Sequence, residues 1–219
     1  RGVLLFGGYQ WDAMSGAELA QGHNSAFVDK QNRSFVVYHT RFSNGGEGHQ
    51  VRVHQLFLND EGWLMAAPFE FDGETITDEA IASKASIADA DIAGDYQFMR
   101  HQYGQNTKAK AFETPVNITL NADGTITGAE KGTWKRTAGT DYIHLTINNV
   151  VYRGVLVKQT IDYTNIPAIA ISALSSSSGS LTIGQNSFTY QQEVWAVKAD
   201  AKAAIKYTLN KLTVPFSNG

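Results

Sequence analysis

Short stretches of β-type composition, separated by clusters of turn-forming residues, run along most of this chain and constrain its fold more than any other feature. In the stretch 50–56, QVRVHQL, apolar and polar residues alternate at the start, which is typical of a strand with one buried face. The clusters KQNR, SNGG and NDEG, which follow three of the early stretches, have turn chemistry. Within the first 71 residues these stretches lie at 3–10, 25–29, 35–42, 50–58 and 63–71. They predict one four-stranded antiparallel sheet.

A sheet of this kind is typical of one blade of a β-propeller, and we assign it to residues 1–75. One blade cannot bury both of its faces alone, so we expect the remainder of the propeller upstream. The first residues support this expectation, because Arg1 runs directly into the strand-like VLLF without a methionine or a leader.

The second half of the chain has the spacing of a small antiparallel β domain. Hairpin turns are predicted at NADG, 121–124, and at INNV, 147–150. The strand-like stretches lie at 96–99, 116–120, 125–127, 132–134, 142–147, 150–158, 168–173, 180–183 and 187–198. So many short strands in about a hundred residues predict a barrel or a sandwich over 92–199. The whole chain is therefore predicted to be all-β.

Two segments depart from the strand pattern. Residues 76–91 are rich in alanine, serine and acidic side chains, and we interpret them as a linker that can contain a short helical turn. Residues 200–219 form a tail in which 201–212 has helical periodicity. The tail is either a helix packed on the barrel or the beginning of a further module.

Composition excludes several classes of function. The formal net charge of −3 gives no electrostatic reason to expect a nucleic acid or an anionic membrane as partner. The absence of cysteine excludes a disulfide scaffold and cysteine catalysis.

Four of the six histidines lie between positions 23 and 54. Their spacing matches no zinc signature. We interpret His49 and His54 as residues of a solvated strand and its loop, and His39 as a hydrogen-bonded structural residue. His23 differs, because it follows Gly22, which lets a backbone approach a ligand closely, and has small polar neighbours.

Several motifs resemble glycoside hydrolase family 43 endo-α-1,5-L-arabinanases. The last propeller blade of that family resembles GHNSAFV at 22–28, YHTRF at 38–42, HQVRVHQL at 49–56 and GW at 62–63, preceded by LFGGYQW at 5–11. The C-terminal β-barrel of its two-domain members resembles GDYQF at 94–98, GTW at 132–134 and YRGVLVKQ at 152–159. The resemblance covers nearly all of residues 2–198.

The resemblance implies a part of a five-bladed propeller that hydrolyses α-1,5-L-arabinan of pectin with inversion, in a secreted bacterial enzyme. Such catalysis requires a general acid facing a base, with room for water between them. In the family these carboxylates come from earlier blades, and the acids early in this chain match none of them: Asp12, Glu18, Asp29, Glu47, Asp60 and Glu61. We therefore assign no catalytic residue and predict that this chain alone is inactive. Its expected partners are the N-terminal propeller portion, in a separate chain or the same polypeptide, and arabinan or arabino-oligosaccharide.

The resemblance also implies that His23 ligates one metal ion in the propeller channel, Ca²⁺ with mostly water ligands. Asn24 and Ser25 are predicted to shape the same wall and contact substrate. Arg52 is either an arginine that approaches the sugar or a solvent-facing strand residue.

Aromatic side chains can stack on sugars, and Trp11 is the candidate for such a platform, whereas Trp63, Trp134 and Trp195 are predicted to be core residues. The alternative to an arabinanase part is a non-catalytic carbohydrate-binding or structural module, in which 92–198 binds polysaccharide or braces the propeller.

Overall fold

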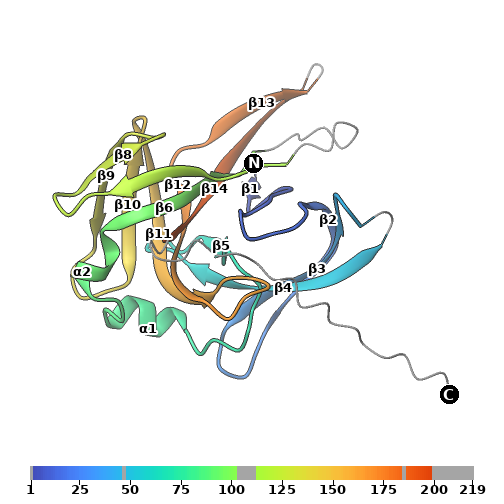
Figure 1. Cartoon of the computed structure of the whole chain (residues 1–219), viewed down its shortest axis with the longest axis horizontal. Helices are drawn as coiled ribbons and strands as arrows, with labels where there is room; N and C mark the ends of the chain where they lie inside the picture. The colour runs from blue at the N-terminus through green and yellow to red at the C-terminus, as the bar shows by residue number, and fades with distance from the viewer. Residues whose placement is uncertain (1, 46–47, 103–111, 184–185, 199–219) are drawn as a thin grey trace.

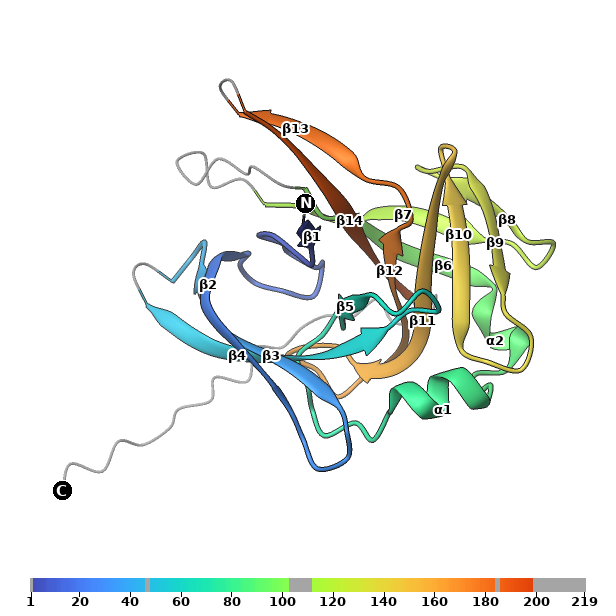
Figure 2. The same ribbon diagram turned by 180° about the vertical axis from the view of Figure 1, so that it is seen from behind.

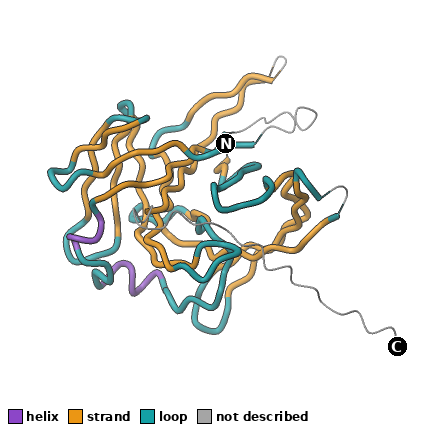
Figure 3. Tube along the Cα trace, viewed as in Figure 1, coloured by secondary structure: helices purple, strands orange, loops and turns teal. Residues whose placement is uncertain are grey.

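The computed structural model describes residues 2–45, 48–102, 112–183 and 186–198. Apart from loops and two short helices, the regular structure of this part of the chain consists of strands (Figure 3), which confirms the predicted all-β class. Its early strands are β1 (Gly2–Leu4), β2 (Glu18–Val28), β3 (Ser34–Phe42), β4 (His49–Leu58) and β5 (Leu64–Ala66). Two short helices follow, α1 (Asp78–Ser83) and α2 (Asp89–Ile92).

The described part of the chain after the helices contains nine strands, and all but β13 form a closed barrel. The nine strands are β6 (Gly94–Arg100), β7 (Val116–Leu120), β8 (Thr125–Gly128), β9 (Gly132–Arg136), β10 (Tyr142–Ile147), β11 (Val150–Thr160), β12 (Pro167–Ser175), β13 (Gly179–Ile183) and β14 (Asn186–Lys198). The order β14-β12-β11-β10-β9-β8-β7-β6 closes on itself because β6 also pairs with β14. Of the two predicted architectures, barrel and sandwich, the structure has the barrel (Figure 1).

The long strand β14 pairs with strands outside the barrel as well as with strands of the barrel. Its early part pairs with β13 in antiparallel register and with β1 in parallel register, and its later part pairs with β12 and β6. The N-terminal segment of the chain is thereby attached to the barrel by backbone hydrogen bonds.

Strands on one side of the barrel bury both of their faces. In β14, Val194 and Ala196 belong to the cluster inside the barrel, whereas Trp195 and Val197 pack outward into a second cluster with the early strands. In β11, Leu156 points inward and its neighbours pack outward. The alternation with period two therefore sorts neighbouring residues into two different cores.

The early strands form a separate four-stranded sheet in the order β2-β3-β4-β5. This sheet is curled and lies beside the barrel, with β5 toward the barrel and β2 at the far edge (Figures 1 and 2). The predicted four-stranded antiparallel sheet is thus present.

Three predicted strand extents differ from the structure. The stretch predicted at 3–10 keeps strand structure only in β1, because residues 5–17 cross the core as a loop whose side chains Tyr9 and Trp11 are buried. The stretch at 63–71 is shortened to β5, and Pro68 lacks the N–H that a further ladder bond would need. In contrast β2 begins seven residues before the predicted start at 25.

Local sequence explains the hairpins well. Asn148 and Asn149 both have positive φ, +50° and +66°, as a two-residue turn between twisted strands requires. Gly124, with φ of +84°, ends the turn between β7 and β8.

The segment 76–91, predicted as a linker, contains α1 and the first residues of α2. The hydroxyl of Thr77 accepts a hydrogen bond from Ala80 N at 3.2 Å and caps α1. Ile81 is buried in the cluster beneath the sheet, and Ile87 is buried in the cluster inside the barrel. The tail 200–219 and the helix expected in it lie outside the described residues. Among the described helices none is long and apolar enough to cross a membrane.

Candidate metal and carbohydrate site

The backbone of β2 is irregular around His23. The pairing of β2 with β3 shifts register on both sides of Gly22, and Ala20 and His23 have positive φ, +53° and +45°. Such bulges leave residues outside the ladder and re-aim their side chains, and a non-glycine residue in this region is uncommon. Gly22 itself is not required for space, since an added Cβ would lie 3.9 Å from its nearest neighbours.

The imidazole of His23 is exposed and contacts one neighbour on β3. Its Nδ1 lies 3.2 Å from Nδ1 of His39. One of these nitrogens donates and the other accepts, so a proton on Nδ1 of His23 would leave its Nε2 as a free lone pair. Loss of hydration, followed by the charges of His23, His49 and Arg41, lowers the pKa of His39. His39 is therefore the hydrogen-bonded residue that the sequence predicts.

A third histidine extends this row across the sheet. The rings of His39 and His49 are 4.8 Å apart, and His49 Nε2 accepts from Arg41 Nε at 2.8 Å. His49 is exposed, as predicted. Even so, the described residues contain no group of three or more His, Cys, Asp or Glu side chains placed to hold a metal.

Asn24 and Ser25 follow His23 on β2, and both are exposed. They lie on the edge strand of the sheet, so their side chains are accessible to a ligand. Ser25 returns to regular register opposite Val37, which places the irregular part of the strand at 20–24.

Arg52 is 7% exposed, and the predicted alternative of a solvent-facing arginine is wrong. Its Nε lies 3.1 Å from Glu18 Oε1 and 3.5 Å from Glu70 Oε2. Its Nη2 donates to Gln50 at 2.7 Å and to Tyr163 Oη, from the loop between β11 and β12, at 2.6 Å. This arginine holds together parts of the chain that are far apart in sequence.

Buried carboxyl groups surround this arginine. Burial raises the pKa of Glu18, and its attraction to Arg52 acts in the opposite direction. Burial also raises the pKa of Asp162 to about 8, although the carboxylate accepts from Glu70 N at 2.9 Å. Neither Asp162 nor Tyr163 stood out in the sequence, because nothing local indicates that their loop reaches Arg52.

His54 is completely buried, which contradicts the prediction of a solvated strand residue. Its Nδ1 donates to Ala67 O at 2.7 Å, so its Nε2 accepts from the Tyr38 hydroxyl at 3.1 Å. Burial lowers its pKa to about 4 and keeps it neutral. From Arg52 to Phe57 both faces of β4 are buried or partly buried, so the alternation that predicts one buried face does not give the environment of His54.

The early acids of the chain are engaged in structural contacts. Asp29 bonds Arg33, Asp12 accepts from Gln97 at 2.6 Å, and Glu47 lies outside the described residues. Asp60 contacts His144 at 2.6 Å and Arg153 at 3.0 Å, and Glu61 contacts Arg153 at 2.8 Å. These pairs connect the β4–β5 hairpin to the barrel.

Two of the tryptophan predictions are wrong. Trp11, the expected sugar platform, is 2% exposed and stacks with Trp195 at 6.3 Å. Trp63, expected in the core, is 47% exposed on the β4–β5 hairpin. Trp195 is buried as predicted, and Trp134 is partly buried against the barrel interior.

By its fold this is an all-β protein in which an eight-stranded antiparallel barrel follows a curled four-stranded sheet. The family model GH43_C, described as a C-terminal lipocalin-like domain, matches residues 68–184. The chain therefore belongs to glycoside hydrolase family 43, as the motifs indicated.

Curated relatives and solved structures agree with this assignment. An extracellular endo-α-(1→5)-L-arabinanase of Thermotoga petrophila is 43% identical over 146 residues, which are 64% of this chain and 28% of the relative. Extracellular endo-α-(1→5)-L-arabinanase 2 of Bacillus subtilis is 38% identical over 162 residues, 72% of this chain and 32% of the relative. The chain thus spans about a third of these proteins or less.

Among solved structures, the family 43 YxiA protein of Bacillus licheniformis has a TM-score of 0.72 at 32% identity, over 89% of this chain and 38% of that one. The endo-1,5-α-L-arabinanase of Thermotoga petrophila has a TM-score of 0.68 at 36% identity, over 90% of this chain and 38% of that one. Both the sheet and the barrel therefore have counterparts in family 43 structures.

Proposed function

We propose that this chain is the C-terminal part of a secreted bacterial arabinanase that hydrolyses α-1,5-L-arabinan, a pectin side chain, with inversion. The observation that carries the proposal is its 43% and 38% identity to two extracellular endo-α-(1→5)-L-arabinanases. In this proposal the curled sheet of residues 1–75 is the last blade of a five-bladed propeller, and 92–199 is the barrel that follows it.

The catalytic carboxylates are proposed to come from the N-terminal portion, which is the chain's partner. An inverting glycosidase needs two carboxyl groups roughly 6.5–9.5 Å apart with water between them. The early acids described above are instead held by arginine, histidine or amide partners, as Glu18 is by Arg52. The edge strand β2, with Phe27 and Val28 exposed at its surface, supports a neighbour in this position.

His23 is proposed to hold one Ca²⁺ through Nε2. The contact between His23 and His39 supports this role, because a metal-binding histidine commonly uses its other nitrogen in a hydrogen bond that fixes the ring. Among the described residues no cluster of acidic ligands accompanies this exposed imidazole, which fits an ion whose other ligands are mostly water. When bound, the ion supplies a local positive charge that favours ionised carboxylates nearby.

Asn24 and Ser25 are proposed to contact the sugar chain from the same edge strand, since both are exposed beside His23. Arg52 enters the proposal in a different way. Its guanidinium is occupied, but two of its partners, Gln50 and Tyr163, are exposed, so a sugar hydroxyl would have to replace one of them.

Fusing the N-terminal portion of the Thermotoga petrophila enzyme to these 219 residues tests the proposal. We expect reducing ends from linear arabinan with the fusion and none with the chain alone, and NMR of the first product should show inverted anomeric configuration. Release of sugar by the chain alone would contradict the placement of the acids upstream.

In the same fusion, His23→Ala is expected to lose bound calcium and most of the turnover. His49→Ala is the matched control. His49 is exposed and neighbours His39 in the same row of histidines, but the proposal gives it no role in calcium binding. Elemental analysis of both variants decides the point: equal calcium in His23→Ala and the parent would refute the ligand assignment.

The second candidate function is a non-catalytic carbohydrate-binding or structural module. The closed barrel favours it, because a barrel with its own complete core can act as a separate unit. Tight arabinan binding without any contribution to turnover in the fusion would support this candidate.

A further inference from the structure

One end of the barrel carries a pocket that the proposed catalytic and metal sites do not use. Its volume is about 800 Å³, within the usual range of small-ligand sites. Because neighbouring strands run in opposite directions, the β7–β8 turn, the β9–β10 turn and the entry into β6 lie at the same end. Residues 85–89, 122–124, 134–136 and 138–139 contribute its lining, and we call it the end pocket.

The wall of the end pocket contains a tryptophan. Trp134 pairs with Leu145 in the β9–β10 ladder and therefore points to the inner side of the barrel, as buried Leu145 does. Its indole Nε1 donates to Asn121 O at 2.8 Å, which fixes the ring. The ring is only partly buried, and much of the remaining pocket lining consists of small residues: Ala85, Ala88, Ala122, Gly124, Ala138 and Gly139.

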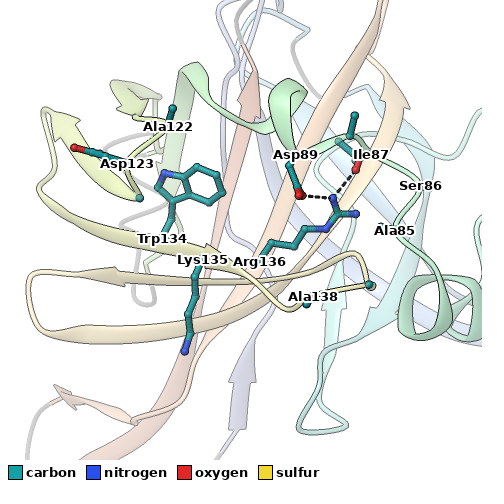
Figure 4. Close-up of a pocket in the computed structure, with 13 residues that line it drawn as sticks. Ala85, Ser86, Ile87, Asp89, Ala122, Asp123, Trp134, Lys135, Arg136 and Ala138 are labelled. Atoms are coloured by element: carbon teal, nitrogen blue, oxygen red, sulfur yellow. Dashed lines mark hydrogen bonds and ion pairs between the residues drawn. The ribbon is translucent and has the colours of Figure 1, made fainter.

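The charges at the pocket favour a neutral ligand rich in hydroxyl groups. Arg136 is fully engaged, with Asp141 at 2.5 Å, Asp89 at 2.8 Å and backbone carbonyls. Asp89 keeps an exposed carboxylate, which can only accept hydrogen bonds. Figure 4 shows Trp134 and Asp89 bordering the same space, while Lys135 points away from the indole. Lys135 also belongs to the lining, but it alternates with Trp134 and Arg136 on β9 and therefore faces the outer side of the strand, so an anionic ligand would meet the Asp89 carboxylate without this cation beside it.

We propose that the end pocket binds a neutral sugar chain, with the apolar face of a sugar ring on the indole of Trp134 and hydroxyls donating to Asp89. Aromatic rings combine a large apolar surface with low conformational cost, and barrel ends are recurrent ligand sites. This goes beyond the arabinanase proposal: the site lies on the barrel, and its occupancy is measured without turnover, so either proposal can fail while the other stands.

Calorimetric titration of the 219-residue chain tests the site. We expect linear α-1,5-arabinopentaose, β-1,4-xylopentaose or both to bind, and the two arms identify which neutral chain is preferred. The pentamer of galacturonic acid is expected to bind more weakly than the better neutral chain. Absence of heat from both neutral chains at millimolar concentration, or tighter binding of the anionic one, would overturn the proposal.

Trp134→Ala is expected to weaken binding by about tenfold or more, equivalent to about 1.4 kcal/mol. Trp63→Ala is the matched control, since Trp63 is the exposed tryptophan of the β4–β5 hairpin, and its affinity should equal that of the parent chain. If Trp134→Ala does not fold, Ala138→Gln fills the end pocket while Trp134 is kept, and it should weaken binding by a similar factor. Parent affinity in a folded Trp134→Ala, or in Ala138→Gln when the former is unfolded, would refute the site.

Discussion

The curled sheet and the barrel are built from the same kind of strand but differ in how their edges and their buried faces are covered. The barrel pairs β6 with β14 and so leaves no edge among its eight strands, and its interior is filled by its own side chains, including Leu145 and Leu156. The sheet has an open edge at β2, where residues 23–28 are exposed. Much of its buried face depends on side chains of the barrel.

The difference shows where each region obtains its stability. The contact surface between the two, which we call the seam, contains Trp195 and Glu193 of β14 against Ala66 of β5. Arg52 and Tyr163 connect the sheet to the barrel loop at a second place. If the sheet depends on the barrel, weakening the seam should unfold the sheet, and the four predictions below test this.

Trp195→Ala is expected to have the largest effect, about 3–5 kcal/mol of unfolding free energy, because it removes a fully buried side chain and leaves a cavity. It also removes the Nε1 donor at 3.0 Å from Ala66 O. Urea unfolding followed by circular dichroism measures the loss. Trp63→Ala should change stability by less than about 0.5 kcal/mol; a similar cost at both positions would break the comparison.

Arg52→Leu is expected to cost about 3 kcal/mol, because it leaves the buried carboxylate of Glu18 without its ion-pair partner. Adding Glu18→Gln to this variant should recover part of the stability, since the unpaired charge is then removed as well. The same urea titrations measure both variants. A double variant less stable than Arg52→Leu would show that the buried charge is not the cause.

His54→Gln is expected to reduce the acid sensitivity of the fold. The folded pKa of His54, about 4, lies below its ordinary value of 6.5, so the unfolded chain takes up a proton first as the pH falls. The stability that neutral His54 contributes is present above pH 6.5 and is lost as the pH falls toward 4. At pH 5 the loss is about 2 kcal/mol.

The measurement is the difference in unfolding free energy between pH 7.5 and pH 5, which should be about 2 kcal/mol smaller in His54→Gln. Asp162 titrates in the opposite sense, because its pKa is raised to about 8 and it stabilises the fold at acidic pH. Asp162 is present in both proteins, so its contribution cancels in the comparison. An equal change in unfolding free energy between the two pH values in both proteins would contradict the neutral buried state of His54.

Tyr163→Phe is expected to have the smallest effect, about 1 kcal/mol, because it removes one hydrogen bond to Arg52 from a largely exposed ring. Combined with Arg52→Leu it should add almost nothing, since the two side chains form one contact. A double-mutant cycle measured by urea unfolding gives this coupling. Fully additive losses of unfolding free energy would show that Tyr163 does not stabilise the seam through Arg52.

The sequence predicted the local parts of the fold well. Period-two alternation and the turns at Asn148 and Gly124 were sufficient for the barrel strands, because a turn requires particular φ values that few residues adopt. His23 was singled out by its motif, and the structure adds that its backbone is irregular. Its role as a metal ligand remains a prediction.

The errors concern which side of a strand or loop is covered. Trp11, Trp63 and His54 were each assigned to the wrong environment. Alternation indicates that one face is buried, but a neighbouring element decides whether the other face is buried too. For Trp11 and His54 that element comes from elsewhere in the chain, as Trp195 does for Trp11, whereas Trp63 lies on an exposed hairpin.

The sequence by itself determined the all-β class, the strands of the barrel, the resemblance to family 43 and the special place of His23. The tertiary structure alone decided the closure of β6 on β14, the buried contacts of Arg52 with the loop at Tyr163, and the end pocket at Trp134. The physical reason is that hydrogen-bonded ladders and turns are encoded by neighbouring residues. Burial, in contrast, is a property of surfaces that meet only after the sheet and the barrel have packed together.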